Sequence, residues 1–151
     1  MKFGAMSLIA GTAMVLSAGF AMAGAADDAI KARQECMKSH GAMMKVAVPM
    51  MKGEAPFDAA ALKATYDGED KACADWAKWW GADTQKGETV ETYAKPEIWT
   101  DAKGFEAAGG AWYEAAQKLR AATDEASFKA AFPAVGEGCK GCHEKFRRPK
   151  S

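Results

Sequence analysis

The chain has 151 residues, the length of a single domain. It contains 34 alanines but only five valines and three isoleucines, so the best helix former is abundant and strand-favouring residues are scarce. This composition argues against a β-sandwich, a β-barrel or a parallel-sheet α/β enzyme. Because 20 basic residues balance 20 acidic ones, the chain is not a strongly basic nucleic-acid binder, and we expect no nucleic-acid partner.

Residues 1–25 have the pattern of a secretory signal peptide. Lys2 supplies a positive charge, residues 6–20 are apolar or small, and small residues favour cleavage after Ala23 or Ala25. The rival interpretation, a membrane anchor, needs about 20 predominantly apolar residues, and two glycines interrupt this stretch. We therefore expect export to the periplasm and a mature protein without a membrane span.

The mature domain, residues 26–151, contains four segments with the periodicity of amphipathic helices. They are expected at about residues 27–52, 56–80, 100–122 and 124–148, with a break or bend in the last segment near Pro133 and Gly136. Thr100 and Asp124 are the predicted N-caps of the last two helices. Residues 82–99 lack a sustained period and are predicted to form a loop with a short turn near residue 98. Four such helices predict an all-α, antiparallel four-helix bundle.

The strongest motif of the chain is C-x-x-C-H at residues 139–143. This spacing is the attachment signature of a c-type haem. Two thiols three residues apart lie on one side of a helix, where each adds to one vinyl group of the porphyrin. The histidine that follows is a usual proximal ligand of haem iron. We therefore expect one covalent haem c on Cys139 and Cys142, with His143 as the proximal iron ligand.

A C-x-x-C pair also occurs in structural disulfides, in thioredoxin-like redox sites and in zinc sites. A redox pair requires a strand-to-helix context, and no strands are predicted here. A zinc site requires a second ligand pair with matching spacing. The remaining candidates, Cys36, His40 and Cys73, do not have that spacing. Export to an oxidising compartment also suits covalent haem attachment.

Three blocks of sequence extend the argument beyond the haem motif. They are Arg33-Gln34-x-x-Met37, Pro96-x-Ile98-Trp99 and Val135-Gly136-x-x-Cys139-x-x-Cys142-His143-x-x-Phe146-Arg147. In these blocks the chain resembles the cytochrome c′ family, in particular its low-spin cytochrome c-556 branch. The resemblance implies a four-helix bundle with the haem on the last helix.

The resemblance also selects a residue for the distal side of the haem. In the family this residue comes four positions after the arginine of the first helix, which places it at Met37. Five-coordinate members carry leucine or a similar apolar residue there, whereas a thioether is a soft iron ligand that raises the reduction potential. We therefore expect a six-coordinate, low-spin, electron-transfer cytochrome with Met37 as the distal ligand. The alternative is a five-coordinate protein that binds NO or CO.

Other residues of the first predicted helix compete for this role. Met44 and Met51 lie near the same face as Met37, and we interpret them as core residues. His40, one turn after Met37, is a competing ligand because imidazole binds iron strongly. Arg33 is predicted to contact a haem propionate, and the alternative is a solvated arginine whose stem packs on the bundle.

Cys36 and Cys73 lie at equal distances from the predicted turn near residue 55. In an antiparallel helical hairpin they would therefore sit at the same height. A disulfide that joins the first two helices is our hypothesis, and two buried free thiols are the alternative.

The remaining features concern partners and catalysis. The basic residues near the haem motif are predicted to steer an acidic redox protein, periplasmic or membrane-bound, or to complement the helix C-terminus; they are Lys145, Arg147, Arg148 and Lys150. The family resemblance allows a homodimer through the first two helices. The tryptophans of residues 76–80 are candidates either for that interface or for packing within the chain. Carboxylate pairs such as Glu69-Asp70 are interpreted as solvated helix face, so we do not expect an enzyme.

Overall fold

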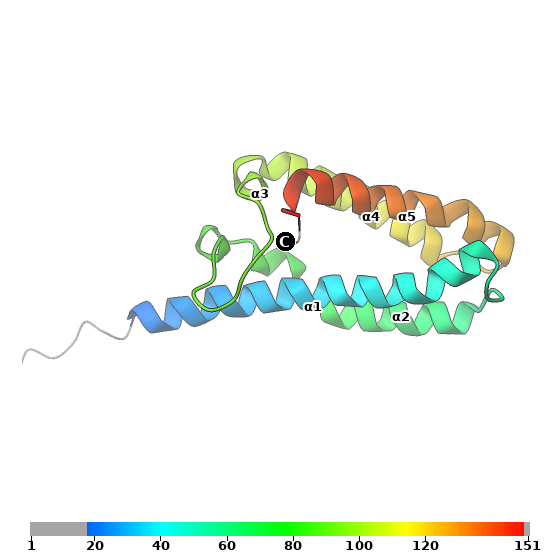
Figure 1. Cartoon of the computed structure of the whole chain (residues 1–151), viewed down its shortest axis with the longest axis horizontal. Helices are drawn as coiled ribbons and strands as arrows, with labels where there is room; N and C mark the ends of the chain where they lie inside the picture. The colour runs from blue at the N-terminus through cyan, green and yellow to red at the C-terminus, as the bar shows by residue number, and fades with distance from the viewer. Residues whose placement is uncertain (1–17, 150–151) are drawn as a thin grey trace, which may run out of the picture.

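The computed structural model describes residues 18–149, with side chains from residue 24 onward. Four long helices form the fold, namely α1 (Ala18–Lys52), α2 (Ala59–Ala72), α4 (Ala102–Arg120) and α5 (Glu125–Phe146). Between them lie a short helix α3 (Glu97–Thr100) and two 3₁₀ turns, η1 (Trp76–Trp79) and η2 (Ala82–Thr84). Figure 1 shows α1 alongside α2 and α4 alongside α5. This is the predicted all-α four-helix bundle, and the described residues contain no β-strand beyond one isolated bridge.

The core lies where the two helical pairs meet. Each long helix contributes buried apolar side chains to one cluster, for example Met43 from α1, Leu62 from α2, Leu119 from α4 and Phe128 from α5. Burial of these side chains removes apolar surface from water, which is the main favourable contribution to folding. A shared cluster therefore joins the two pairs into one bundle.

The first helix begins earlier than predicted. Periodicity placed its start near residue 27, whereas α1 begins at Ala18. Residues 18–26 include five alanines, and alanine favours helix wherever no breaker intervenes. The first 17 residues of the predicted signal peptide lie outside the described residues, so cleavage after Ala23 or Ala25 stays a prediction. Within residues 18–149, no helix has a stretch long and apolar enough to cross a bilayer.

The second helix ends earlier than predicted. The sequence pattern continued to Trp80, but α2 ends at Ala72 and the chain turns into η1. The turn places the Trp80 ring edge-on to Phe105 of α4, with 4.7 Å between ring centroids. The early end of α2 therefore coincides with the packing of this tryptophan against α4.

Two expectations about the later helices also need correction. The N-cap of α4 is Asp101 and not Thr100, because the Asp101 carboxylate accepts a hydrogen bond from the Gly104 N–H at 3.0 Å. The predicted break in α5 is absent, and the helix continues through Pro133. Phe132 and Val135 on either side of this proline are buried in the core, and their packing offsets the hydrogen bond that proline cannot donate.

The N-cap of α5 is Asp124, as predicted. Its carboxylate accepts a hydrogen bond from the Ser127 N–H at 2.7 Å, and the Ser127 hydroxyl accepts one from the Asp124 N–H at 3.2 Å. This reciprocal capping box satisfies two backbone donors that the first turn leaves free. The start of the helix that carries the haem motif is therefore set by local sequence.

The hypothesised cystine is present and joins the first two helices. Cys36 on α1 and Cys73 at the end of α2 form a disulfide, with 5.0 Å between their Cα atoms.

The long segment before α4 is held in place by hydrogen bonds at several points. The Asp27 carboxylate accepts hydrogen bonds from the N–H groups of Glu88 and Thr89, and the Lys95 N–H donates to the Phe146 carbonyl at 3.0 Å. These contacts hold the segment against both α1 and the end of α5.

Candidate functional site

The C-x-x-C-H motif lies on the last two turns of α5. Cys139 and Cys142 are free thiols and, like His143, are half-buried. Burial raises the pKa of both thiols and lowers the pKa of the His143 imidazole, with a smaller contribution from Arg147. The imidazole is therefore neutral at neutral pH, which is the form that ligates a metal.

A close contact between α4 and α5 positions the motif. Gly138, directly before Cys139, packs so tightly on Trp112 that a Cβ atom built at residue 138 would lie 3.1 Å from the Trp112 Cα. Cys139 packs against the core cluster. Phe146, three residues after His143, is buried with 2% of its surface exposed. The motif is therefore held from both sides by core packing.

The fold brings α1 close to this motif. The His40 ring lies 4.4 Å from the Trp112 ring, between centroids. Burial, with smaller contributions from the charges of Arg120 and His143, lowers the pKa of His40 to about 4. Trp112 in turn packs against Gly138, the residue directly before the motif. The part of α1 that carries His40 thus faces the part of α5 that carries His143.

Met37 lies one turn before His40 and has a surface-accessible side chain, with 36% of its surface exposed. The buried residues of this part of α1 include Cys36, Met43 and Met50, which lie at other positions of the helix than Met37. Met44 and Met51 are half-buried against the core cluster, in agreement with their interpretation as core residues.

Arg33 is buried, with 5% of its surface exposed. Its Nη2 donates a hydrogen bond to the Thr84 carbonyl at 2.6 Å, and its guanidinium carbon lies 4.6 Å from the centroid of the Trp80 ring. Burial lowers the pKa of Arg33 to about 10, so the side chain still carries its charge at neutral pH. Its Nη1 is buried and has no hydrogen-bond partner among the described residues. The alternative of a solvated arginine is therefore wrong.

Aromatic rings packed edge-to-face connect Arg33 to the end of α5. Trp80 contacts Phe105, and Phe105 contacts Phe146 with 5.3 Å between ring centroids. Trp76 joins the same group at 4.8 Å from Trp80. These tryptophans thus pack within the chain, as one of the two sequence interpretations proposed.

Sequence reasoning missed an acidic residue near His40. Glu69 was interpreted as solvated, but only 3% of its side chain is exposed. Its Oε2 accepts a hydrogen bond from Arg120 Nη2 at 2.8 Å, and Arg120 Nη1 also donates to Asp70 at 2.7 Å. Burial raises the pKa of Glu69, and the Arg120 guanidinium opposes this shift. No spacing in the sequence pairs Glu69 with Arg120, which is 51 residues away.

The basic residues near the motif are largely paired. Lys145 forms an ion pair with Asp101 at 2.6 Å, and Arg148 lies 3.9 Å from Glu91. Arg147 is exposed, and Lys150 lies outside the described residues. This surface is therefore less positive than the sequence alone indicated.

The chemistry of these groups fits a covalent haem c. One helix presents two thiols and a neutral imidazole, and another presents a thioether. Arg33 Nη1 and Trp80 Nε1 are buried N–H donors without a hydrogen-bond partner among the described residues. They are suited to groups that only accept hydrogen bonds, such as carboxylates. Cys139 and Cys142 are the groups that would hold the porphyrin.

The four-helix bundle and the C-x-x-C-H motif together define a c-type cytochrome. A family model described as Cytochrome C' matches residues 28–147. A cytochrome c' from Alcaligenes xylosoxydans xylosoxydans is 37% identical over 131 residues, which cover 82% of this chain and 96% of the relative. The chain therefore belongs to the cytochrome c′ family, and its cofactor is one covalent haem c.

Two further similarities bear on function. A cytochrome c-556 from Rhodopseudomonas palustris is 30% identical over 145 residues, which cover 93% of this chain and 95% of the relative. A solved structure of a mutant cytochrome c prime from Alcaligenes xylosoxidans, as its nitric oxide complex, superposes with a TM-score of 0.70 at 33% identity. That match covers 82% of this chain and 97% of the other. Relatives of both kinds are thus similar to this chain over most of their length.

Proposed function

We propose that this cytochrome carries single electrons in the periplasm, with His143 and Met37 as the two axial ligands of a low-spin haem. A bound haem c supplies an iron that alternates between the ferric and ferrous states. The chain's own residues attach the porphyrin, fix the identity of both axial ligands and limit access of water. We do not expect the protein to be an enzyme.

The observation that carries this proposal is the placement of Met37. Its thioether is accessible although most methionines of α1 pack into the core. It lies one turn before His40, whose ring lies 4.4 Å from that of Trp112, the residue on which Gly138 beside the motif packs. A methionine there favours ligation because thioethers bind ferrous iron, and paired histidine and methionine ligands raise the reduction potential. A ligand on α1 opposite one on α5 would also limit geometric change on electron transfer.

Arg33 completes the proposed site. Two nitrogens of its buried guanidinium donate hydrogen bonds, to the carbonyls of Ala29 and Thr84, and the third has no partner among the described residues. A buried cation is stabilised by an anionic partner, and the carboxylates of a haem are anions. We therefore propose that Arg33 Nη1 contacts a propionate, while Nη2 stays on the Thr84 carbonyl.

A second candidate function is binding of a small gas by a five-coordinate haem. It is supported by the similarity to the mutant cytochrome c prime that was solved as its nitric oxide complex. The two functions differ in the state of the distal position. A ligated thioether there would compete with CO and NO, whereas an apolar side chain would leave the position open.

The optical spectrum of the holoprotein tests the choice. We expect a low-spin ferrous spectrum that CO does not change, and a Met37→Leu variant that becomes high-spin and binds CO. Met44→Leu is the matched control, because Met44 lies two turns further along α1 and packs on the core. Leucine and methionine have similar volumes, so either substitution should cost less than about 1.5 kcal/mol of stability. A wild-type protein that is high-spin and binds CO would assign the gas-binding function instead.

Export and assembly belong to the same proposal. The intact mass of the holoprotein should correspond to cleavage after Ala23 or Ala25 plus one haem, and an uncleaved chain would contradict export. A redox protein with an acidic surface is the proposed partner, with the exposed Arg147 near the motif as its contact. The homodimer through α1 and α2 stays a prediction that sedimentation analysis of the holoprotein tests.

A further inference from the structure

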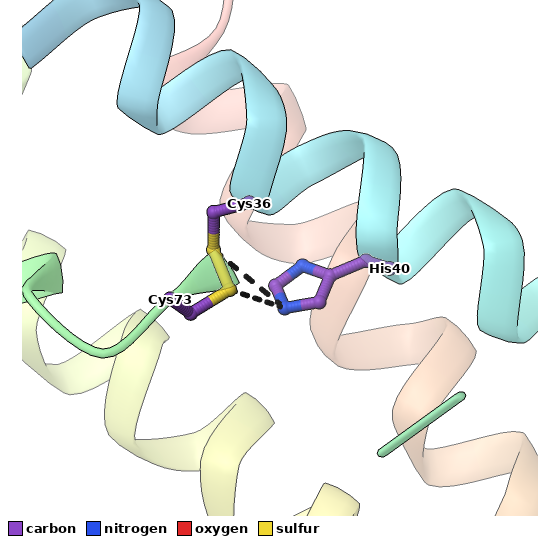
Figure 2. A group of neighbouring side chains, drawn as sticks. All are labelled: Cys36, His40 and Cys73. Atoms are coloured by element: carbon purple, nitrogen blue, oxygen red, sulfur yellow. Dashed lines mark hydrogen bonds between the residues drawn. A yellow bond between two sulfur atoms is a disulfide. The ribbon is translucent and has the colours of Figure 1, made fainter. Parts of the chain in front are cut away.

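A second cluster of ligand-type side chains lies between α1 and α2. Cys36 and His40 project from successive turns of α1, and Cys73 reaches them from the end of α2 (Figure 2). The His40 Nε2 lies 4.0 Å from the Cys36 sulfur and 3.7 Å from the Cys73 sulfur. All three ligand atoms lie within 4.8 Å of one another. The sequence count predicted that Cys36 and Cys73 meet, but it gave no sign that His40, 33 residues from Cys73, joins them.

Glu69 supplies a further group beside His40, next to the three ligand atoms that already lie together. Its Oε1 lies 3.6 Å from His40 Nε2, and the side chain is 3% exposed. This oxygen is buried and has no hydrogen-bond partner among the described residues, while Oε2 is held by Arg120. A buried carboxylate oxygen without a donor is energetically unfavourable. It would be stabilised by a cation placed next to His40.

We propose that reduction of the Cys36–Cys73 disulfide creates a site for a divalent cation of the zinc class, bound by Cys36, Cys73, His40 and Glu69. Two thiolates, one imidazole and one carboxylate form a donor set typical of zinc, which prefers four ligands of nitrogen, sulfur and oxygen in a tetrahedral arrangement. Neither the haem motif nor the proposed axial ligands take part in this site.

The site forms in two steps, reduction of the disulfide and then binding of the cation. A dithiol donor delivers two electrons and two protons to the S–S bond, and the donor itself becomes a disulfide. The products in this chain are the two thiols of Cys36 and Cys73. Binding of the divalent cation then displaces the two thiol protons and forms two metal–thiolate bonds. The disulfide and the metal complex therefore exclude each other.

The local charges favour a divalent cation over a monovalent one. Two thiolates and the Glu69 carboxylate carry three negative charges, and Arg120 contributes one positive charge at 2.8 Å from Glu69. A divalent cation brings the net charge of this buried group to zero, which keeps the cost of burying charge low. The His40 imidazole is neutral, since burial lowers its pKa to about 4, so it is able to ligate at neutral pH.

The backbone at Cys73 suits the required movement. Two thiolates on one zinc ion must separate beyond the length of an S–S bond. Cys73 is the C-cap of α2, with φ −110° and ψ 6°, and is half-buried. A side chain at a helix end is less constrained than one inside a helix. Cys36 and His40 stay fixed on α1 and present two ligands one turn apart.

Native mass spectrometry of the holoprotein tests the proposal. Its Cys139 and Cys142 thiols are consumed by haem attachment, so Cys36 and Cys73 are the cysteines available for reduction. After treatment with a phosphine reductant and its removal without oxygen, we expect one Zn²⁺ per chain with loss of two protons. The untreated disulfide form should bind no Zn²⁺. In the reduced form, zinc should also protect both cysteines from alkylation.

Variants separate this site from adventitious binding. His40→Ala and Glu69→Gln should each weaken zinc binding at least about tenfold, the lower end of what loss of a supporting group costs a metal site. Asp67→Asn, on the exposed face of α2, is the matched control and should leave the affinity unchanged. Circular dichroism and the haem spectrum report whether each variant is folded. A folded, reduced wild type that binds no zinc, or that binds it equally tightly after His40→Ala, overturns the proposal.

Discussion

The disulfide between α1 and α2 should contribute substantially to the stability of this bundle. It closes a loop with a sequence separation of 37 residues. The chain-entropy relation gives a stabilisation of about 4 kcal/mol at 25 °C for a loop of that length. For a domain of this size, such a loss corresponds to a fall in Tm of about 10 to 20 °C. We expect this fall in the double variant Cys36→Ala, Cys73→Ala.

Thermal unfolding of the holoprotein, followed by circular dichroism, measures this effect. Wild-type protein reduced with a phosphine is the matched control. It loses the cross-link but keeps every non-hydrogen atom of the side chains and gains only the two thiol hydrogens. The reduced wild type, kept free of divalent metal by a chelator, and the double variant should melt within a few degrees of each other. If both melt within about 3 °C of the oxidised protein, the cross-link does not act through loop closure. That result would refute loop closure as the source of the stabilisation.

Two further predictions concern buried groups. The lowered pKa of His40, about 4 in the folded state against 6.5 as the ordinary value, means that the unfolded chain binds a proton first as the pH falls. The free energy of unfolding should therefore decrease between about pH 6.5 and pH 4, by up to about 3 kcal/mol from this group. Urea titrations of His40→Gln should lack that part of the decrease. A variant with the same pH profile as the wild type would contradict the lowered pKa of His40. Gly138→Val should cost about 1–3 kcal/mol more than the control Gly136→Val. A Cβ atom at residue 138 meets Trp112, whereas one at residue 136 has no atom of the described residues within 4 Å beyond its own helix backbone. Equal urea midpoints of the two holoproteins would contradict this prediction.

Much of the fold follows from local sequence. The scarcity of β-branched residues, the helical periodicity and the capping box at Asp124 are properties of short segments, and each predicted an element that the structure contains. The C-x-x-C-H spacing is also local, because two thiols three residues apart share one side of a helix whatever surrounds them. Even the disulfide followed from a simple count, since residues equidistant from a hairpin turn meet across it.

Boundaries set by packing were predicted less well. The end of α2, eight residues before the expected position, coincides with the aromatic group that includes Trp80 and Phe105. The passage of α5 through Pro133 depends on buried neighbours that compensate for a missing hydrogen bond. Propensity describes one segment at a time, so it does not include stabilisation that arises from another helix.

The tertiary structure alone decided which polar groups are buried together. Glu69 has the sequence context of an exposed residue, yet it lies beside His40 and Arg120 because α1, α2 and α4 converge there. The same convergence places Cys73 next to His40, although the spacing of these residues along the chain is unlike that of a zinc site. Sequence spacing specifies a ligand set only when the ligands share one segment. Ligands from separate helices come together through packing of the whole bundle, and that packing is a property of the folded chain.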